Sequence, residues 1–117
     1  MGNLTTHVLD LAAGTPARAM AIELSRVEGA SRRVVARFET NADGRCDAPL
    51  LTGDDMQPGV WEIDFHVAAY YRARGVTLPS PPFLDVVSVR FGIASAAQHY
   101  HVPLLVSPWS YSTYRGS

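Results

Sequence analysis

The chain has 117 residues, and its ten basic and eleven acidic side chains give a formal net charge of −1. This balance argues against nucleic acid or an anionic membrane as the main partner, because both bind through a concentrated basic field. The length predicts one domain, residues 1–117, whose core needs neither disulfides nor a structural metal. Cys46 is the single cysteine, and the N-terminal segment lacks the pattern of a secretory signal, so a reducing, cytoplasmic compartment is expected.

Alternating apolar and polar residues predict three half-buried antiparallel strands in the first part of the chain, at residues 4–9, 17–27 and 33–40. In the first strand, His7 lies on the same face as Thr5. In the third, Val34 is expected to face the core. Residues 10–16, between the first two strands, have the composition of a turn.

A polar turn and an irregular segment come next. Residues 41–45 contain Asn, Asp and Gly, which favour the positive-φ positions of a tight turn. Arg45 is the first residue past this turn, where a side chain is well placed to reach a ligand. Residues 47–58 are polar and end at a proline, so we expect a loop with a short strand at Leu50 and Leu51.

The next segments predict a strand, a helix and a second strand. Residues 59–67 alternate, with Glu62 and Asp64 on the outward face. Residues 68–75 break the alternation, contain helix formers and finish with arginine before glycine, which is typical of a short helix. A proline-containing loop then leads to the alternating strand at residues 85–93.

Residues 99–117 combine polar and apolar side chains up to the C-terminus. In a strand, His99 and His101 would share a face, and Pro103, which lacks an N–H group, would lie on an edge strand or face an unpaired side. A final strand after Ser107-Pro108 would carry residues 114–117 to its end. Seven or eight short strands and one helix predict an all-β, antiparallel two-sheet sandwich.

Seven polar residues are candidates for chemistry: His7, Arg45, His99, His101, Tyr114, Arg115 and Ser117. The simpler alternative for each is structural, since strand histidines are mostly surface or hydrogen-bonded residues and an arginine beside a turn is mostly solvated. Three of the histidines, His7, His99 and His101, could also provide a zinc site, although nothing in the sequence fixes the distances between them. We expect no metal and no other cofactor.

Four stretches in this order carry a resemblance: LTTHVLD with GTPA, the turn DGR, HYHVPLL followed by SP, and the terminal YSTYRGS. Together they are similar to the 5-hydroxyisourate hydrolases, the transthyretin-related enzymes of urate breakdown. The similarity spans essentially the whole chain. The terminal Tyr-Arg-Gly-Ser separates these enzymes from transthyretin, the hormone carrier of the same fold.

The resemblance implies a transthyretin-like homotetramer, a dimer of dimers, whose sites lie in the channel where the dimers meet. The implied substrate is a small molecule, 5-hydroxyisourate. The implied reaction is its hydrolysis to 2-oxo-4-hydroxy-4-carboxy-5-ureidoimidazoline by a histidine-activated water. The implied catalytic residues are His7, Arg45, His101 and Ser117, and the implied substrate-binding residues are His7, Arg45, Tyr114, Arg115 and Gly116. Which histidine is the base stays open. The alternative function is a carrier that binds an aromatic ligand without turnover.

Overall fold

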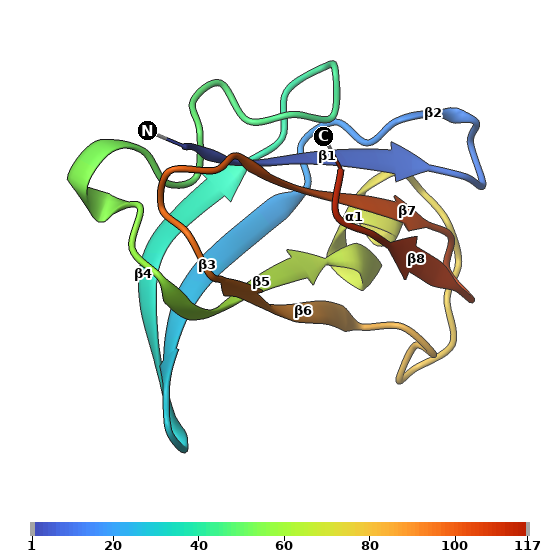
Figure 1. Cartoon of the computed structure of the whole chain (residues 1–117). Helices are drawn as coiled ribbons and strands as arrows, with labels where there is room; N and C mark the ends of the chain where they lie inside the picture. Colours follow the sequence, from blue (N-terminus) through green and yellow to red (C-terminus); the bar gives the residue numbers. More distant parts are fainter. Residues whose placement is uncertain (1, 117) are drawn as a thin grey trace.

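Two four-stranded β-sheets stack into a sandwich in the computed structural model, which describes residues 2–116 (Figure 1). In one sheet the order is β2-β1-β7-β8, formed by Thr15–Pro16, Leu4–Asp10, Tyr100–Val106 and Tyr111–Thr113. In the other it is β4-β3-β5-β6, formed by Ser31–Glu39, Ala21–Glu28, Gly59–His66 and Val86–Ile93. A 3-10 turn, η1 (Gly53–Asp55), and a helix, α1 (Val67–Ala73), complete the fold. The predicted all-β two-sheet sandwich with one short helix is confirmed.

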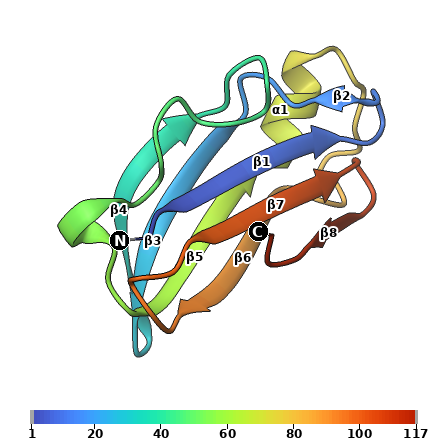
Figure 2. The same ribbon diagram turned by 45° about the horizontal axis from the view of Figure 1, so that its top comes forward.

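One strand pair departs from the antiparallel prediction: β1 and β7 run parallel. Figure 2 shows them side by side and pointing the same way. The alternation of apolar and polar residues within a strand shows which residues share a face, but it does not show which strand lies beside it. The sequence therefore could not reveal this pairing. Because β8 covers only the last part of β7, Pro103 lies just beyond the β7–β8 ladder and on no edge strand. Its missing N–H group therefore breaks no ladder hydrogen bond.

The core lies between the sheets. Large apolar side chains from both sheets are fully buried there, among them Leu4, Val8, Ile22, Leu24, Ile63, Phe65 and Leu104. Burying each contributes about 1.5–3 kcal/mol of transfer free energy. The alternate residues of β1, including Thr5 and His7, point outward and are only partly buried. The core thus fixes which side chains the outward face presents.

Three expectations for individual strands were wrong. β3 starts at Ala21 and not at residue 17, because Ala19 has a φ of 64° and bends the chain. Val34 is 36% exposed where a core position was expected, since β4 is an edge strand and its register with β3 shifts after Leu24. The expected strand at Leu50 and Leu51 is reduced to a single bridge between Leu51 and Leu4.

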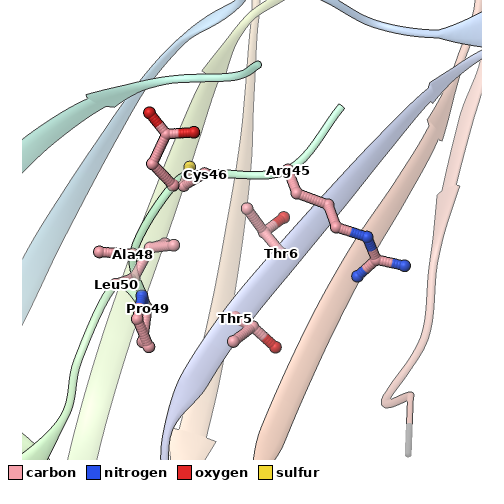
Figure 3. Close-up of a pocket in the computed structure, with 8 residues that line it drawn as sticks. Thr5, Thr6, Arg45, Cys46, Ala48, Pro49 and Leu50 are labelled. Atoms are coloured by element: carbon pink, nitrogen blue, oxygen red, sulfur yellow. The ribbon is translucent and has the colours of Figure 1, made fainter. Parts of the chain in front are cut away.

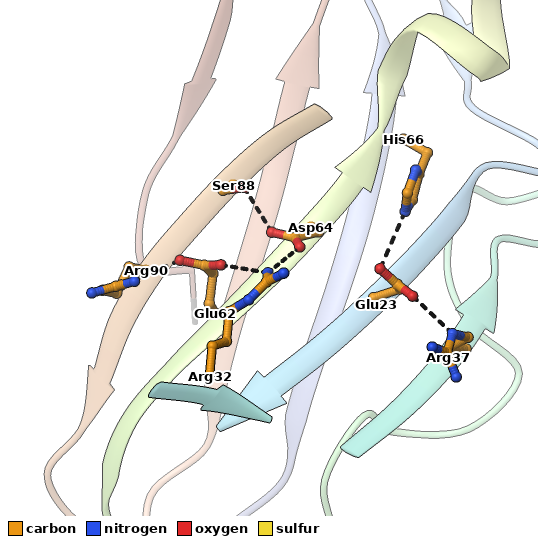
Figure 4. A network of polar contacts seen from close by, with 8 residues as sticks. All are labelled: Glu23, Arg32, Arg37, Glu62, Asp64, His66, Ser88 and Arg90. Atoms are coloured by element: carbon orange, nitrogen blue, oxygen red, sulfur yellow. Dashed lines mark hydrogen bonds and ion pairs between the residues drawn. The ribbon is translucent and has the colours of Figure 1, made fainter. Parts of the chain in front are cut away.

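Glu62 and Asp64 face outward as predicted, yet they are only 7% and 5% exposed. Figure 4 shows the cause: Arg32 reaches over from β4 and donates to both carboxylates, at 2.7 Å to Glu62. Arg90 and Ser88 donate to the same pair from the other side. These ion pairs and hydrogen bonds cover both carboxylates on the outer face of the β4-β3-β5-β6 sheet.

A buried carboxylate ties α1 to the first sheet. Asp10, 1% exposed at the end of β1, accepts hydrogen bonds from the hydroxyls of Tyr70 and Tyr71, each at 2.8 Å. Its side chain also accepts the N–H group of Ala13 at 3.0 Å. The role of α1 in this fold is to pack its tyrosines against Asp10 and the core.

No helix within residues 2–116 is long and apolar enough to cross a membrane.

This arrangement predicts loss of stability at alkaline pH. Burial and the Asp10 carboxylate raise the pKa of Tyr70 from 10.0 to about 12, and the same causes raise the pKa of Tyr71. The folded state therefore holds these protons more tightly than the unfolded state above pH 10. The free energy of unfolding should fall there by up to roughly 1.4 kcal/mol per pH unit for each tyrosine. Urea unfolding at a series of alkaline pH values measures this slope.

Tyr70→Phe tests the assignment, because it removes one of the two titrating hydroxyls. The variant should be less stable at neutral pH, since Asp10 loses a donor, and its stability should fall less steeply above pH 10. An unchanged slope would assign the alkaline loss to other groups.

Candidate active site

His7 and His101 lie on neighbouring strands and on the same outward face of the sheet. In the parallel β1–β7 pair, Thr5 is opposite His101 and His7 is opposite Pro103, so the two imidazoles are diagonal neighbours. The Thr5 hydroxyl and His101 Nδ1 share a hydrogen bond of 2.9 Å. This bond orients the ring and leaves His101 Nε2 for another partner. Both histidines are half-buried, which keeps them within reach of a ligand.

The turn after β4 brings Arg45 to this face. The side-chain oxygen of Asn41 accepts the N–H group of Arg45 at 3.2 Å, and the Gly44 carbonyl accepts the Val8 N–H group at 2.8 Å. Gly44 has a φ of 74°, and a Cβ there would collide with the Val8 carbonyl oxygen. Glycine is therefore needed for the turn to dock on β1. Figure 3 shows the Arg45 side chain extending from the turn across β1.

The chain end returns to β7 beside His101. The Gly116 N–H group donates to the His101 carbonyl at 2.8 Å, forming an isolated bridge. A Cβ on Gly116 would lie 2.6 Å from His101 Cδ2, so the glycine backbone packs directly on the imidazole. Tyr114, two residues earlier, is 60% exposed. Ser117, the other predicted catalytic residue, lies outside the described residues.

The surroundings lower the pKa of His101 below its ordinary value of 6.5. Burial is the main cause, and the positive charge of Arg45 and the neighbouring His7 act in the same direction. At neutral pH the His101 imidazole is therefore neutral and has one nitrogen free to accept a proton. The guanidinium of Arg45 and the ring of His7 make no hydrogen bond to any other group in residues 2–116, so both can serve a ligand.

A pocket of about 170 Å³ adjoins this face, lined in part by Thr5, Thr6, Arg45 and Cys46 (Figure 3). Burial and the nearby Asp47 carboxylate raise the pKa of the Cys46 thiol. The thiol is thus protonated at neutral pH and is a poor nucleophile. The pocket extends the face formed by His101 and Arg45 but brings no nucleophile to it.

Two predicted residues lie elsewhere. His99 precedes β7, and its Nδ1 accepts the Asn3 N–H group at 3.1 Å. No three His, Cys, Asp or Glu side chains of the described chain are grouped to hold a metal ion, so the three-histidine zinc arrangement is not formed. The Arg115 guanidinium points to Gln98 and the His99 carbonyl. Sequence reasoning missed Thr5, although its place on the face of His7 was a usable signal.

Comparison with known proteins identifies the family. The HIUase/Transthyretin family matches residues 4–116. The chain belongs to this family. The 5-hydroxyisourate hydrolase of Ralstonia nicotianae is 62% identical over 117 residues, which is 100% of each chain. This confirms the resemblance inferred from the motifs.

Solved structures of the HIUase/Transthyretin fold superpose closely. (S)-Allantoin synthase gives a TM-score of 0.93 at 46% identity, with 99% of this chain covering 44% of that longer protein. Sea bream transthyretin in complex with thyroxine gives 0.87 at 31% identity, covering 97% of this chain and 94% of that one. The same sandwich thus occurs in proteins with different names, one of them in complex with thyroxine, so function has to be argued from the site.

Proposed function

We propose that this protein hydrolyses 5-hydroxyisourate to 2-oxo-4-hydroxy-4-carboxy-5-ureidoimidazoline, as a step of urate breakdown. The observation that carries the proposal is the convergence of two imidazoles and one guanidinium on a single outward face of the β2-β1-β7-β8 sheet. The name of the Ralstonia nicotianae relative, identical at 62% of positions, supports the same substrate.

The reaction opens a six-membered ring by hydrolysis of a cyclic amide. The oxygen of water bonds to the ring carbonyl carbon, the carbon–nitrogen bond breaks, and the nitrogen takes up a proton. Three groups are therefore needed: a base for the water, donors for the carbonyl oxygen as it gains negative charge, and an acid for the leaving nitrogen. No electron transfer occurs, so the residues of the face can meet the demands by proton transfer and hydrogen bonding.

His101 is the general base in this proposal. The role requires the tautomer in which Nδ1–H donates to the Thr5 hydroxyl across their 2.9 Å contact, because the Nε2 lone pair can then take the proton of the attacking water. A neutral ring at neutral pH, favoured by burial and by Arg45, suits this role. His7, the diagonal neighbour, orients the water and supplies the proton to the leaving nitrogen. This assignment chooses between the two histidines that the sequence left equivalent.

Arg45 stabilises the carbonyl oxygen. Its guanidinium is planar and offers a fork of donors, which matches the flat, oxygen-rich ring better than the point charge of lysine. Tyr114 and Gly116 frame the substrate from the C-terminal side, and Ser117 completes this frame. The Tyr114 side chain is exposed, so its hydroxyl is accessible to a ligand.

The site is open on an exposed sheet face, and we propose that a second copy of the chain covers it in a homotetramer. Each of the four copies would contribute one sandwich domain, residues 1–117. Catalysis gains from excluding water around the charged groups, and the flat face cannot do this alone. Exposed aromatic side chains also favour association: Phe83 is 70% exposed, Trp109 is 58% exposed, and their rings lie 6.2 Å apart. We further propose a cytoplasmic location, for which the lone Cys46 is the support.

The test is the ultraviolet absorbance decay of 5-hydroxyisourate, generated in place from urate by a urate oxidase. We expect decay much faster than the spontaneous reaction and unchanged by a chelator. No acceleration by the folded protein would overturn the proposal and favour the carrier alternative, in which an aromatic ligand binds without turnover. Loss of activity on chelation would overturn the metal-free mechanism.

The lowered pKa of His101 predicts the acid limb of the pH profile. A base must be neutral, so the midpoint of the fall in kcat/KM on the acid side should lie below 6.5, the ordinary histidine pKa. Arg45→Gln removes a positive charge that disfavours the imidazolium, so the pKa of His101 should rise and the limb should move to higher pH. Profiles of kcat/KM over about pH 5 to 9 measure both. A limb that stays in place in Arg45→Gln would contradict the assignment of His101 as base.

A further inference from the structure

The chain beyond β8 stays in register with β7 although the ladder is interrupted. β8 pairs Thr113 with Leu104, and the later bridge pairs Gly116 with His101, so both belong to one antiparallel register. The two intervening positions of β7 include Pro103, which has no N–H group to donate. Besides the single Gly116–His101 hydrogen bond, side-chain contacts therefore hold the chain end against β7.

The register also determines which way Arg115 points. It places Arg115 opposite Val102, whose side chain is buried toward the other sheet, and Gly116 opposite His101 on the outward face. Arg115 accordingly lines a cavity between the sheet edges, with Val89, Phe91 and Tyr100 among its other walls. The guanidinium thus lies on the side of the sheet away from His7 and His101.

Three contacts fasten Arg115 to the start of β7. Its Nη2 donates to Gln98 Oε1 and to the His99 carbonyl, both at 3.1 Å. The guanidinium also stacks over the Tyr100 ring at 4.2 Å from the centroid. Tyr100 is itself fixed, because its hydroxyl accepts the N–H groups of Ala94 and Ser95 at 2.9 and 3.2 Å. Arg115 is therefore clamped to a rigid part of the fold.

We propose that Arg115 is a positioning residue that clamps the chain end to β7 and so keeps Gly116 against His101. This differs from the substrate-binding role that the family resemblance implied for it. The inference rests on the proposed function for its effect on catalysis, but the clamp itself is a structural claim. Arg115 acts through Gly116 and does not touch the substrate.

The functional test compares Arg115→Ala with Arg115→Lys. Loss of the clamp should lower kcat roughly tenfold to a hundredfold with little change in KM, because a small misplacement of catalytic groups costs this much. Lysine lacks the planar fork and should restore activity only in part. Added guanidinium ion should rescue Arg115→Ala by filling the same contacts. Arg74→Ala, which removes an arginine stacked on Tyr70 at 5.5 Å and remote from the site, is the matched control and should keep full activity.

A second readout does not depend on activity. In the unchanged protein the Gly116 N–H group is bonded to His101, so its hydrogen exchange should be protected, and Arg115→Ala should speed it about tenfold or more. Unchanged Gly116 exchange would overturn the clamp, whatever the kinetics. A large rise in KM at unchanged exchange would show direct substrate binding instead. If the unchanged protein fails to hydrolyse 5-hydroxyisourate, the exchange experiment still decides whether Arg115 holds the chain end.

Discussion

The His101→Ala variant is expected to hydrolyse 5-hydroxyisourate about 10²- to 10⁴-fold more slowly than the unchanged protein, because it loses the base that activates water. The hydrogen bond to Thr5 and the neutral state of the ring both prepare His101 for this role. The side chain is only half-buried and points away from the core, so the fold should survive. Steady-state kinetics and thermal unfolding of the same preparation measure the two effects separately.

His66→Ala is the matched control for this prediction. His66 is also a half-buried strand histidine, but it lies on the other sheet and its ring faces Glu23 at 3.5 Å (Figure 4). Its removal should leave kcat unchanged. If His101→Ala unfolds, or if both variants lose activity equally, His101 is structural and the proposed base is wrong. His7→Ala is expected to behave like His101→Ala and would show whether both rings are required.

Most of the fold could be predicted because the alternation of apolar and polar residues along a strand follows the alternation of buried and exposed positions. β1, β5 and β6 were found close to their expected bounds, and their inward residues form the core. The errors occur where burial is not set by the strand itself. The pattern places Glu62 and Asp64 on the solvent side, but Arg32 reaches across β3 and, with Arg90 and Ser88 of β6, covers both carboxylates. The pattern places Val34 in the core, but the edge position of β4 and the register shift with β3 expose it.

The candidate site was predictable in its members but not in its geometry. Family motifs pointed to His7, Arg45 and His101. The structure brings these three onto one face through the parallel pair of β1 and β7, which no local sequence pattern predicts. The clamp proposed for Arg115 would mark a limit of transferring roles to every residue of a motif together. Neighbouring residues of an extended segment face opposite ways, so Gly116 and Arg115 cannot both approach His101. The register of the last residues with β7 decides which of the two faces His101. That register depends on pairing between segments that are distant in the sequence.

Gly116→Ala is expected to lower kcat roughly tenfold to a hundredfold while changing the free energy of unfolding by less than about 1 kcal/mol. The added Cβ would lie 2.6 Å from His101 Cδ2 and close to the rest of the imidazole, a separation that real contacts do not reach. Either the ring or the chain end must move. The chain end is exposed and contributes no side chain to the core, so it yields first and the core keeps its packing. Kinetics and urea unfolding of the variant test both parts.

Gly92→Ala is the control that isolates this contact. Gly92 lies on β6 in an ordinary strand conformation, and a Cβ there would meet nothing nearer than 4.0 Å. It should therefore keep both activity and stability. If Gly116→Ala retains full activity, the approach of the chain end to His101 is incidental and the terminal residues do not belong to the site. Gly116→Ala and Arg115→Ala can also be combined. If each reduces kcat but the double variant loses no more kcat than either single variant, both act through the same placement of the chain end. The second change then has no ordered chain end left to disturb.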